Sequence, residues 1–233
     1  MTVLRSMLFG LIQAGTAVVF SLLSLLTFPL APVPRNRLLA AWARFMVWLG
    51  QALLGIGYRV EGMEHLPAGP VILLAKHQSA WETIAFQVIF PPLCFVLKKE
   101  LLRIPFFGWG LAMTSPIAID RAAGREALRE IEEQGRKRLQ DGLWVVIFPE
   151  GTRIEPGERG KYNIGGAWLA AKTGVPVVPV AHNAGRVWPK NALLKRPGEV
   201  TVSIGPVIAT QGRKANEINA EAEAWIETRM AGM

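Results

Sequence analysis

The segment VILLAKHQSAWET, residues 71–83, contains the transition from which the rest of the fold can be read. An apolar run, Val71 to Ala75, stops at Lys76 and His77, and an amphipathic segment follows. Short continuous apolar runs are typical of strands that are buried on both faces of a parallel sheet. The segment therefore predicts a buried strand, a short turn that carries His77, and a helix that begins near Ala80.

The same alternation of apolar runs and helical patterns continues from Tyr58 onward, which predicts a largely parallel sheet flanked by helices. The helical patterns cover Ala80 to Ile89, Arg125 to Gln140, Gly166 to Thr173 and Asn216 to Met230. The predicted strands are YRVEG (58–62), VILLA (71–75), LCFVL (93–97), SPIAI (115–119), WVVIF (144–148), VPVVPVA (175–181) and VTVSIG (200–205).

The N-terminal region has a different composition. No charged residue occurs from Ser6 to Pro34, and the apolar core from Met7 to Phe28 just exceeds the roughly 20 residues that span a bilayer. Three prolines, Pro29, Pro32 and Pro34, are expected to end it. A cleaved signal peptide is less favoured, because the apolar region is too long for one. A helix that crosses the bilayer and one that is half inserted both fit this pattern.

A second apolar stretch, Leu38 to Tyr58, is rich in tryptophan and carries Arg44, as expected for a helix at the membrane surface. Residues 1–57 are therefore predicted to form a membrane-associated two-helix segment, and residues 58–233 an α/β domain. Basic residues flank the apolar segments, which favours a cell (inner) membrane location with the active site facing the cytoplasm.

The chain of 233 residues is 51% hydrophobic, with a formal net charge of +8 and a pI near 10.1. An apolar, basic chain favours anionic lipids or phosphorylated substrates as partners over nucleic acid, and it contains no nucleic-acid-binding motif. Cys94 is the only cysteine, which excludes an intramolecular disulfide framework and a cysteine-rich zinc site.

His77 and Glu82 stand out as a candidate catalytic pair. On one helix, five residues would place them about 140° apart, but a helix that starts near Ala80 lets them meet across the turn. A carboxylate bonded to one ring nitrogen leaves the other free to accept a proton from a hydroxyl. The alternative is a capping box from Ser79 to Glu82, which explains Glu82 but not His77. Ser79 as a nucleophile would lack the G-x-S-x-G turn.

Other charged groups follow the neighbouring predicted strands. The glycine of PEGTR (149–153) permits a tight turn, and its arginine offers a planar fork suited to phosphate. Asp120 and Arg121 follow SPIAI, and Lys98 and Lys99 follow LCFVL. Each group has a plain alternative as a surface ion pair or a turn. Because ligands bind beyond the carboxyl ends of parallel strands, we expect these groups to converge.

In this order and spacing, HQSAWE (77–82), IDR (119–121), FPEGTR (148–153) and VPVVPV (175–180) resemble the four sequence blocks of the glycerolipid acyltransferases. Among these, bacterial 1-acyl-sn-glycerol-3-phosphate acyltransferases are the most similar. The resemblance runs from about residue 35 to 208 and includes KKEL, IPFFGW and HNAG. The family usually pairs its histidine with aspartate, so Glu82 is a variant of the pattern.

The resemblance implies transfer of an acyl group from acyl-CoA or acyl-carrier protein to the sn-2 hydroxyl of lysophosphatidic acid, giving phosphatidic acid in phospholipid biosynthesis. It implies no cofactor and no metal. His77 would be the general base, and Glu82 would orient it. The residues that it places at the substrate are Lys98, Lys99, Asp120, Arg121, Glu150, Gly151, Thr152, Arg153, Val178 and Pro179.

Several alternatives stay open from the sequence. The acceptor could instead be glycerol-3-phosphate, another lysophospholipid or a lyso-ornithine lipid. A membrane-bound lipid-binding protein without turnover is a further alternative, although binding alone needs no base. The sequence carries no signal for acyl-chain length, for the choice of donor or for oligomeric state.

Overall fold

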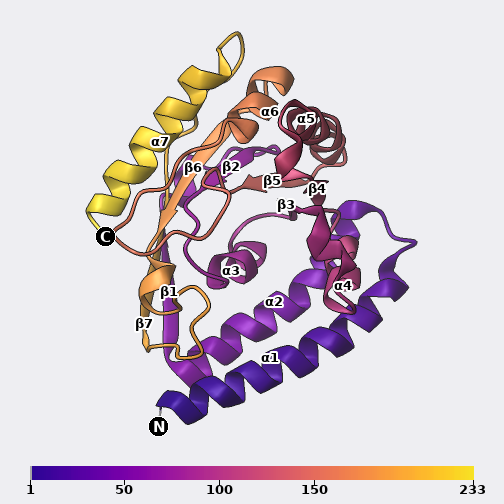
Figure 1. The fold of residues 1–233 in the computed structure, drawn as a ribbon, viewed down its shortest axis with the longest axis vertical. Coiled ribbons are helices and arrows are strands. Elements are labelled where there is room, and N and C mark those ends of the chain that lie inside the picture. The colour runs from indigo at the N-terminus through magenta and orange to yellow at the C-terminus, as the bar shows by residue number, and fades with distance from the viewer. Residues whose placement is uncertain (1) are drawn as a thin grey trace.

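The structure is a computed structural model that describes residues 2–233, and it contains one seven-stranded sheet (Figure 1). The strand order is β1-β7-β6-β2-β5-β3-β4. All neighbouring strands are parallel except β6 and β7. The largely parallel sheet predicted from the sequence is confirmed. Its strands are β1 (Ile56–Glu61), β2 (Ile72–Ala75), β3 (Leu93–Lys98), β4 (Ile117–Ile119), β5 (Trp144–Ile147), β6 (Val177–His182) and β7 (Gly198–Ile204).

Helices cover both faces of the sheet. Figure 1 shows α5, α6 and α7 on one face and α1, α2 and α3 on the other. Side chains alternate along the central strand β2: Leu73 and Ala75 join the core on the side of α3, whereas Ile72 and Leu74 join the core on the side of α6. The helices are α1 (Thr2–Ser24), α2 (Pro32–Leu54), α3 (Trp81–Ile89), α4 (Phe107–Met113), α5 (Arg125–Gln140), α6 (Gly165–Thr173) and α7 (Ala215–Ala231).

The four helices predicted after Tyr58 are found to within one residue at each end, but the N-terminal boundaries differ. The first helix ends at Ser24, before the three prolines that were predicted to end it, and Pro32 and Pro34 also have a role that was not predicted. They occupy the first turn of α2, where a proline loses no helical hydrogen bond. The second helix ends at Gly55, whose φ of 70° is left-handed. Helix α4, which begins at Phe107 within the IPFFGW segment, was not predicted.

Helix α1 buries serine side chains and exposes many of its leucines. It buries Ser6 and Ser21, whereas Leu4 and Leu11 are 73% and 71% exposed. Within residues 2–233, it is the one helix that is long and apolar enough to cross a membrane, with α2 failing that test. A face of exposed leucines is expected where a helix meets lipid rather than water.

Both ends of α1 nevertheless contact the body of the protein. Near its start, the backbone amide of Lys195 donates to Ser6 Oγ at 3.1 Å. Near its end, α4 crosses so closely that a Cβ on Gly110 would lie 2.5 Å from Ser21 Oγ. These contacts are 15 residues apart, or about 22 Å along a helix. Helix α1 therefore lies along the α/β body beside α2, as Figure 1 shows, and does not project from it.

This arrangement gives the two faces of α1 different roles. Phe9 is fully buried and packs edge-to-face on Trp188 at 5.2 Å, so Phe9→Ala should destabilise the protein by about 3–5 kcal/mol. Leu11→Ala, on the exposed face, should change stability by less than about 0.5 kcal/mol. Thermal unfolding in detergent measures both. Equal losses from the two variants would contradict the assignment of the faces.

Candidate active site

His77 and Glu82 meet across the turn between β2 and α3. The Nδ1–H of His77 donates to Glu82 Oε1 at 2.8 Å. The glutamate is fully buried, and the histidine side chain is 15% exposed. Since Nδ1 is occupied, Nε2 is the ring nitrogen that can accept a proton from a substrate, which is the arrangement of a general base.

Glu82 makes the hydrogen bonds of a helix cap as well as its contact with His77. The same Oε1 also accepts hydrogen bonds from the amides of Gln78 at 2.9 Å and Ser79 at 2.8 Å. Ser79 Oγ accepts from the amide of Trp81, the first residue of α3, so the serine caps the helix. Burial opposes the charged form of Glu82, but the imidazoles of His182 and His77 and the Ser79 amide lower its pKa overall.

The imidazole of His77 is also fixed from one side. Its ring stacks on Phe148, with centroids 4.0 Å apart and an interplanar angle of 12°. Phe148 follows β5 and is the first residue of the FPEGTR block. The ring of His77 is therefore held by a hydrogen bond at one edge and by a flat aromatic surface, which limits its rotation.

The FPEGTR block lies against the same turn. Glu150 Oε2 accepts from the backbone amide of His77 at 3.0 Å, and the amide of Ile154 donates to the His77 carbonyl at 2.8 Å. Glu150 is only 6% exposed, so the structure directs it inward, away from solvent. Gly151 has φ +67°, a conformation that favours glycine. Thr152, the next residue, is exposed.

Two arginines follow strands β4 and β5, which β3 separates in the sheet. Arg153 is partly exposed, and within residues 2–233 no carboxylate forms an ion pair with its guanidinium. Arg121 Nη1 donates to the carbonyl oxygen of Gly151, which links the block after β4 to the block after β5. Two planar cations beside the His77 turn are suited to binding a phosphate.

The lysines after β3 differ from each other. Lys99 Nζ forms an ion pair with Asp120 at 2.8 Å, and this hydrogen bond lowers the pKa of Asp120. Asp120 also accepts from the amide of Ala122 and caps the turn that follows β4. Lys98 ends β3 and is exposed. The ion pair of Lys99 and Asp120 thus connects the segments after β3 and β4. Lys98 points to solvent, where it could meet an anion.

Val178 and Pro179 lie elsewhere. They occupy the interior of β6, opposite Leu73 and Leu74 of β2, and both are buried. The Val178 side chain belongs to the core on the α3 side of the sheet. The structure does not bring these two residues to the strand ends where the charged groups lie.

Two buried polar residues near His77 were noted in the sequence but given no role there. Lys76 is 1% exposed, and its ammonium bonds Glu150 and Glu227. His182 is fully buried at the end of β6, and burial lowers its pKa. Its Nε2 lies 3.9 Å from Glu82 Oε1. Both residues directly follow or end a predicted strand, and this position is the signal that could have identified them.

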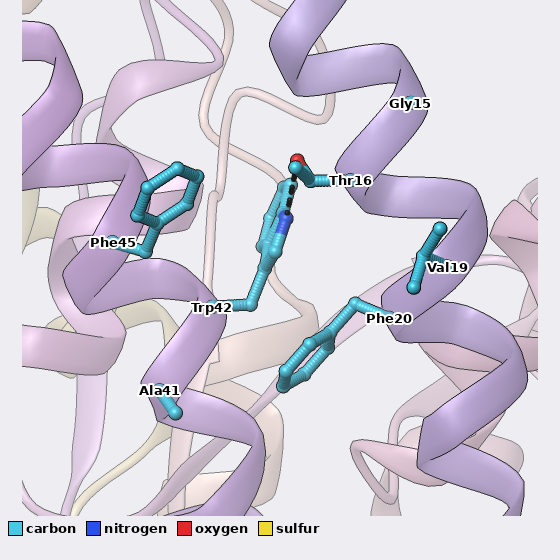
Figure 2. Close-up of a pocket in the computed structure, with 7 residues that line it drawn as sticks. All are labelled: Gly15, Thr16, Val19, Phe20, Ala41, Trp42 and Phe45. Atoms are coloured by element: carbon cyan, nitrogen blue, oxygen red, sulfur yellow. Dashed lines mark hydrogen bonds between the residues drawn. The ribbon is translucent and has the colours of Figure 1, made fainter.

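A groove of about 350 Å³ lies between α1 and α2, separate from the His77 turn (Figure 2). Within it, Trp42 Nε1 donates to Thr16 Oγ1 at 3.1 Å, so the tryptophan joins the two helices. The groove is lined by Gly15, Thr16, Val19, Phe20, Ala41, Trp42 and Phe45.

Within residues 2–233, no three His, Cys, Asp or Glu side chains gather closely enough to hold a metal ion.

Comparisons with known proteins show which family the chain resembles. The Acyltransferase family model matches residues 57–183. A 1-acyl-sn-glycerol-3-phosphate acyltransferase of Pseudomonas aeruginosa is 46% identical over 98% of this chain and 91% of its own length. An enzyme of the same name from Saccharomyces cerevisiae is 34% identical over 79% of this chain, which spans 63% of that protein.

A crystal structure titled as the 1-acyl-sn-glycerophosphate (LPA) acyltransferase PlsC from Thermotoga maritima matches with a TM-score of 0.82. The match covers 99% of this chain and 95% of the other, at 24% identity, and so supports the fold. The resemblance predicted from four sequence blocks is confirmed by the family model and by a relative that is alike along almost the whole chain. On these findings, the chain belongs to the acyltransferase family.

Proposed function

We propose that this protein transfers an acyl group from a thioester donor to the sn-2 hydroxyl of 1-acyl-sn-glycerol-3-phosphate and so forms phosphatidic acid. The observation that carries the proposal is the hydrogen-bonded pair of His77 and Glu82 at the edge of the sheet where Arg121 and Arg153 also follow strands. The names of the relatives from Pseudomonas and yeast support this acceptor.

The chemistry follows from the direction of the His77–Glu82 hydrogen bond. His77 Nε2 takes the proton of the acceptor hydroxyl as its oxygen attacks the thioester carbonyl. The imidazolium that forms is stabilised by the Glu82 carboxylate at 2.8 Å. When the tetrahedral intermediate collapses, the C–S bond breaks, and the imidazolium returns the proton to the departing thiolate. An ester and a free thiol result, and His77 is neutral again.

Arg153 is proposed to be the principal ligand of the acceptor phosphate, with Arg121 beside it and Lys98 as a further cation. Lys99 forms an ion pair with Asp120, so its proposed role is to fix the turn after β4 and not to bind the phosphate. Either acyl-CoA or acyl-carrier protein fits as donor, because both supply a thioester and both carry phosphate or acidic groups.

The membrane-facing surface is proposed to combine α1 with the start of α4. The exposed leucines of α1 adjoin a second exposed apolar group on the segment that packs against α1: Ile104, Phe106, Phe107 and Trp109. Because α1 contacts the body at both ends, we infer that it lies within one leaflet rather than across the bilayer. The basic residues flanking the two N-terminal helices favour the cytoplasmic side of the inner membrane.

The first test is product formation by purified protein given lysophosphatidic acid and a long-chain acyl-CoA, or acyl-carrier protein in a second assay. His77→Ala should lower kcat by roughly 10²–10⁴-fold, since the base is removed. Glu82→Gln keeps an acceptor oxygen but loses the charge that stabilises the imidazolium, and should cost roughly 10²-fold or more. Glu126→Gln, in an exposed pair with Arg129, is the matched control and should leave kcat unchanged. A folded His77→Ala protein with full activity would refute the mechanism.

The second test separates a phosphorylated acceptor from a phosphate-free one such as a lyso-ornithine lipid. Arg153→Ala should raise KM for lysophosphatidic acid by roughly 10–100-fold while kcat changes little, because a charge-assisted contact in the ground state is lost. Arg129→Ala, on the exposed face of α5, should leave both constants unchanged. An unchanged KM for Arg153→Ala would instead favour an acceptor without phosphate.

A further inference from the structure

We propose that Lys76 is a positioning residue for His77. Its ammonium group connects Glu227 of the last helix, α7, to Glu150, and Glu150 in turn accepts a hydrogen bond from the backbone of His77. The inference rests on the proposed function, because it assigns His77 as the base whose position matters. It extends that function to a part of the chain, α7, that lies outside the four sequence blocks.

The side chain of Lys76 is buried in a ring of oxygen acceptors. Its Nζ donates to Glu150 Oε1 at 2.7 Å, to Glu227 Oε1 at 3.0 Å and to the carbonyl of Glu158 at 3.3 Å. The lysine is 1% exposed, and a buried ammonium group is tolerated only when it is paired and hydrogen-bonded in this way. Since all three contacts are specific, Lys76 cannot move without leaving a buried charge unpaired.

A single carboxylate, that of Glu150, connects this ammonium group to the backbone of His77. Glu150 accepts from Lys76 Nζ with Oε1 and from the His77 amide with Oε2 at 3.0 Å. The two oxygens of a carboxylate are rigidly connected, so fixing one fixes the other. Loss of the lysine would therefore loosen the backbone hydrogen bond of the catalytic histidine.

The backbone of Lys76 is held as well. Its amide donates to the Val180 carbonyl at 2.9 Å, in the β2–β6 ladder. His182 accepts from the Ala184 amide at Nδ1, so its Nε2 carries the proton and donates to the Lys76 carbonyl at 2.8 Å. The residue directly before His77 is thus fixed through its amide, its carbonyl and its side chain.

Glu227 brings α7 into this network. Its Oε1 accepts from Lys76 and also from the Tyr162 hydroxyl at 2.8 Å. Burial and the Glu227 hydrogen bond raise the pKa of Tyr162, so the phenol remains a donor. Figure 1 shows α7 along the edge of the molecule, outside β6. Among these contacts, the hydrogen bond from Lys76 to Glu227 is the one that connects α7 to the His77 turn.

This geometry predicts a particular kinetic signature. A displaced base lowers the rate of the chemical step, because reaction depends steeply on the alignment of base and hydroxyl. Binding of the acceptor phosphate depends on Arg121 and Arg153, which follow other strands and do not contact Lys76 among the bonds described for residues 2–233. Loss of the network should therefore lower kcat and leave KM nearly unchanged.

The test compares Glu227→Gln with Glu223→Gln, the same substitution one turn earlier on α7. Glu223 pairs with Arg159 at 2.6 Å on the surface and has no bond to Lys76 in the described chain. Glu227→Gln should lower kcat roughly tenfold with KM within about twofold of the unaltered protein, whereas Glu223→Gln should change neither. Lys76→Met should lower kcat more strongly than Glu227→Gln, because two carboxylates lose their partner.

A rescue variant distinguishes positioning from a loss of folding. In Lys76→Met/Glu150→Gln, the buried carboxylate is replaced by a neutral amide whose oxygen can still accept from the His77 amide. This double variant should recover part of the kcat lost in Lys76→Met. If rates expressed per folded molecule were equal in all these variants, Lys76 would have only a structural role, and the proposal would be overturned.

Hydrogen exchange at the His77 amide gives a readout that does not require turnover. Lys76→Met and Glu227→Gln should speed exchange of this amide, and Glu223→Gln should not. An unaltered protein that forms no product with any donor would refute the proposed function, while the exchange measurement would still decide whether α7 supports His77. Unchanged exchange in both variants would overturn the proposal.

Discussion

The geometry of the site depends on one buried carboxylate oxygen, Glu82 Oε1, which accepts hydrogen bonds from the His77 ring and from the amides of Gln78 and Ser79. These donors come from successive residues of one turn, so a single atom fixes both the path of the backbone and the orientation of the ring. Because Glu82 is fully buried in the first turn of α3, its position is set by the packing of that helix against the sheet. The cap of α3 and the proposed orientation of the base therefore depend on the same contact, and removal of the carboxylate would disturb both.

The parallel sheet brings the arginines that follow other strands close to this turn. Strands β2, β4 and β5 all end at the same edge, so His77, Arg121 and Arg153 become neighbours although they are far apart in the sequence. The links between the blocks are made by backbone groups: the carbonyl of Gly151 accepts from Arg121, and the amide of Ile154 donates to the His77 carbonyl. His77 and the two arginines are thus linked through backbone groups at one edge of the sheet, and the leucines of α1, which packs beside α2, are exposed.

The fold and the contact between His77 and Glu82 could be predicted because their signals are local. Buried strands appear as continuous apolar runs, and the His77–Glu82 spacing is meaningful once the start of α3 is placed correctly. The contact between Lys76 and Glu227 spans 151 residues and depends on how α7 docks beside β6, which no local pattern encodes. Glu150 was predicted at the substrate because its block resembles a binding motif, but its two oxygens are used by Lys76 and His77. The place of Pro32 and Pro34 at the start of α2 was not predicted, because a proline can end one helix or begin the next.

The central claim is that His77 presents an unprotonated Nε2 because Glu82 holds the proton on Nδ1. Nitrogen-15 NMR of protein labelled at its three histidines tests this directly, with His65→Asn and His182→Gln variants used to assign the signals. At neutral pH the account predicts the Nδ1–H tautomer for His77 and the opposite Nε2–H tautomer for His182. It also predicts that Glu82→Gln mixes the two tautomers of His77. A His77 ring that carries its proton on Nε2 in the unaltered protein would contradict the account.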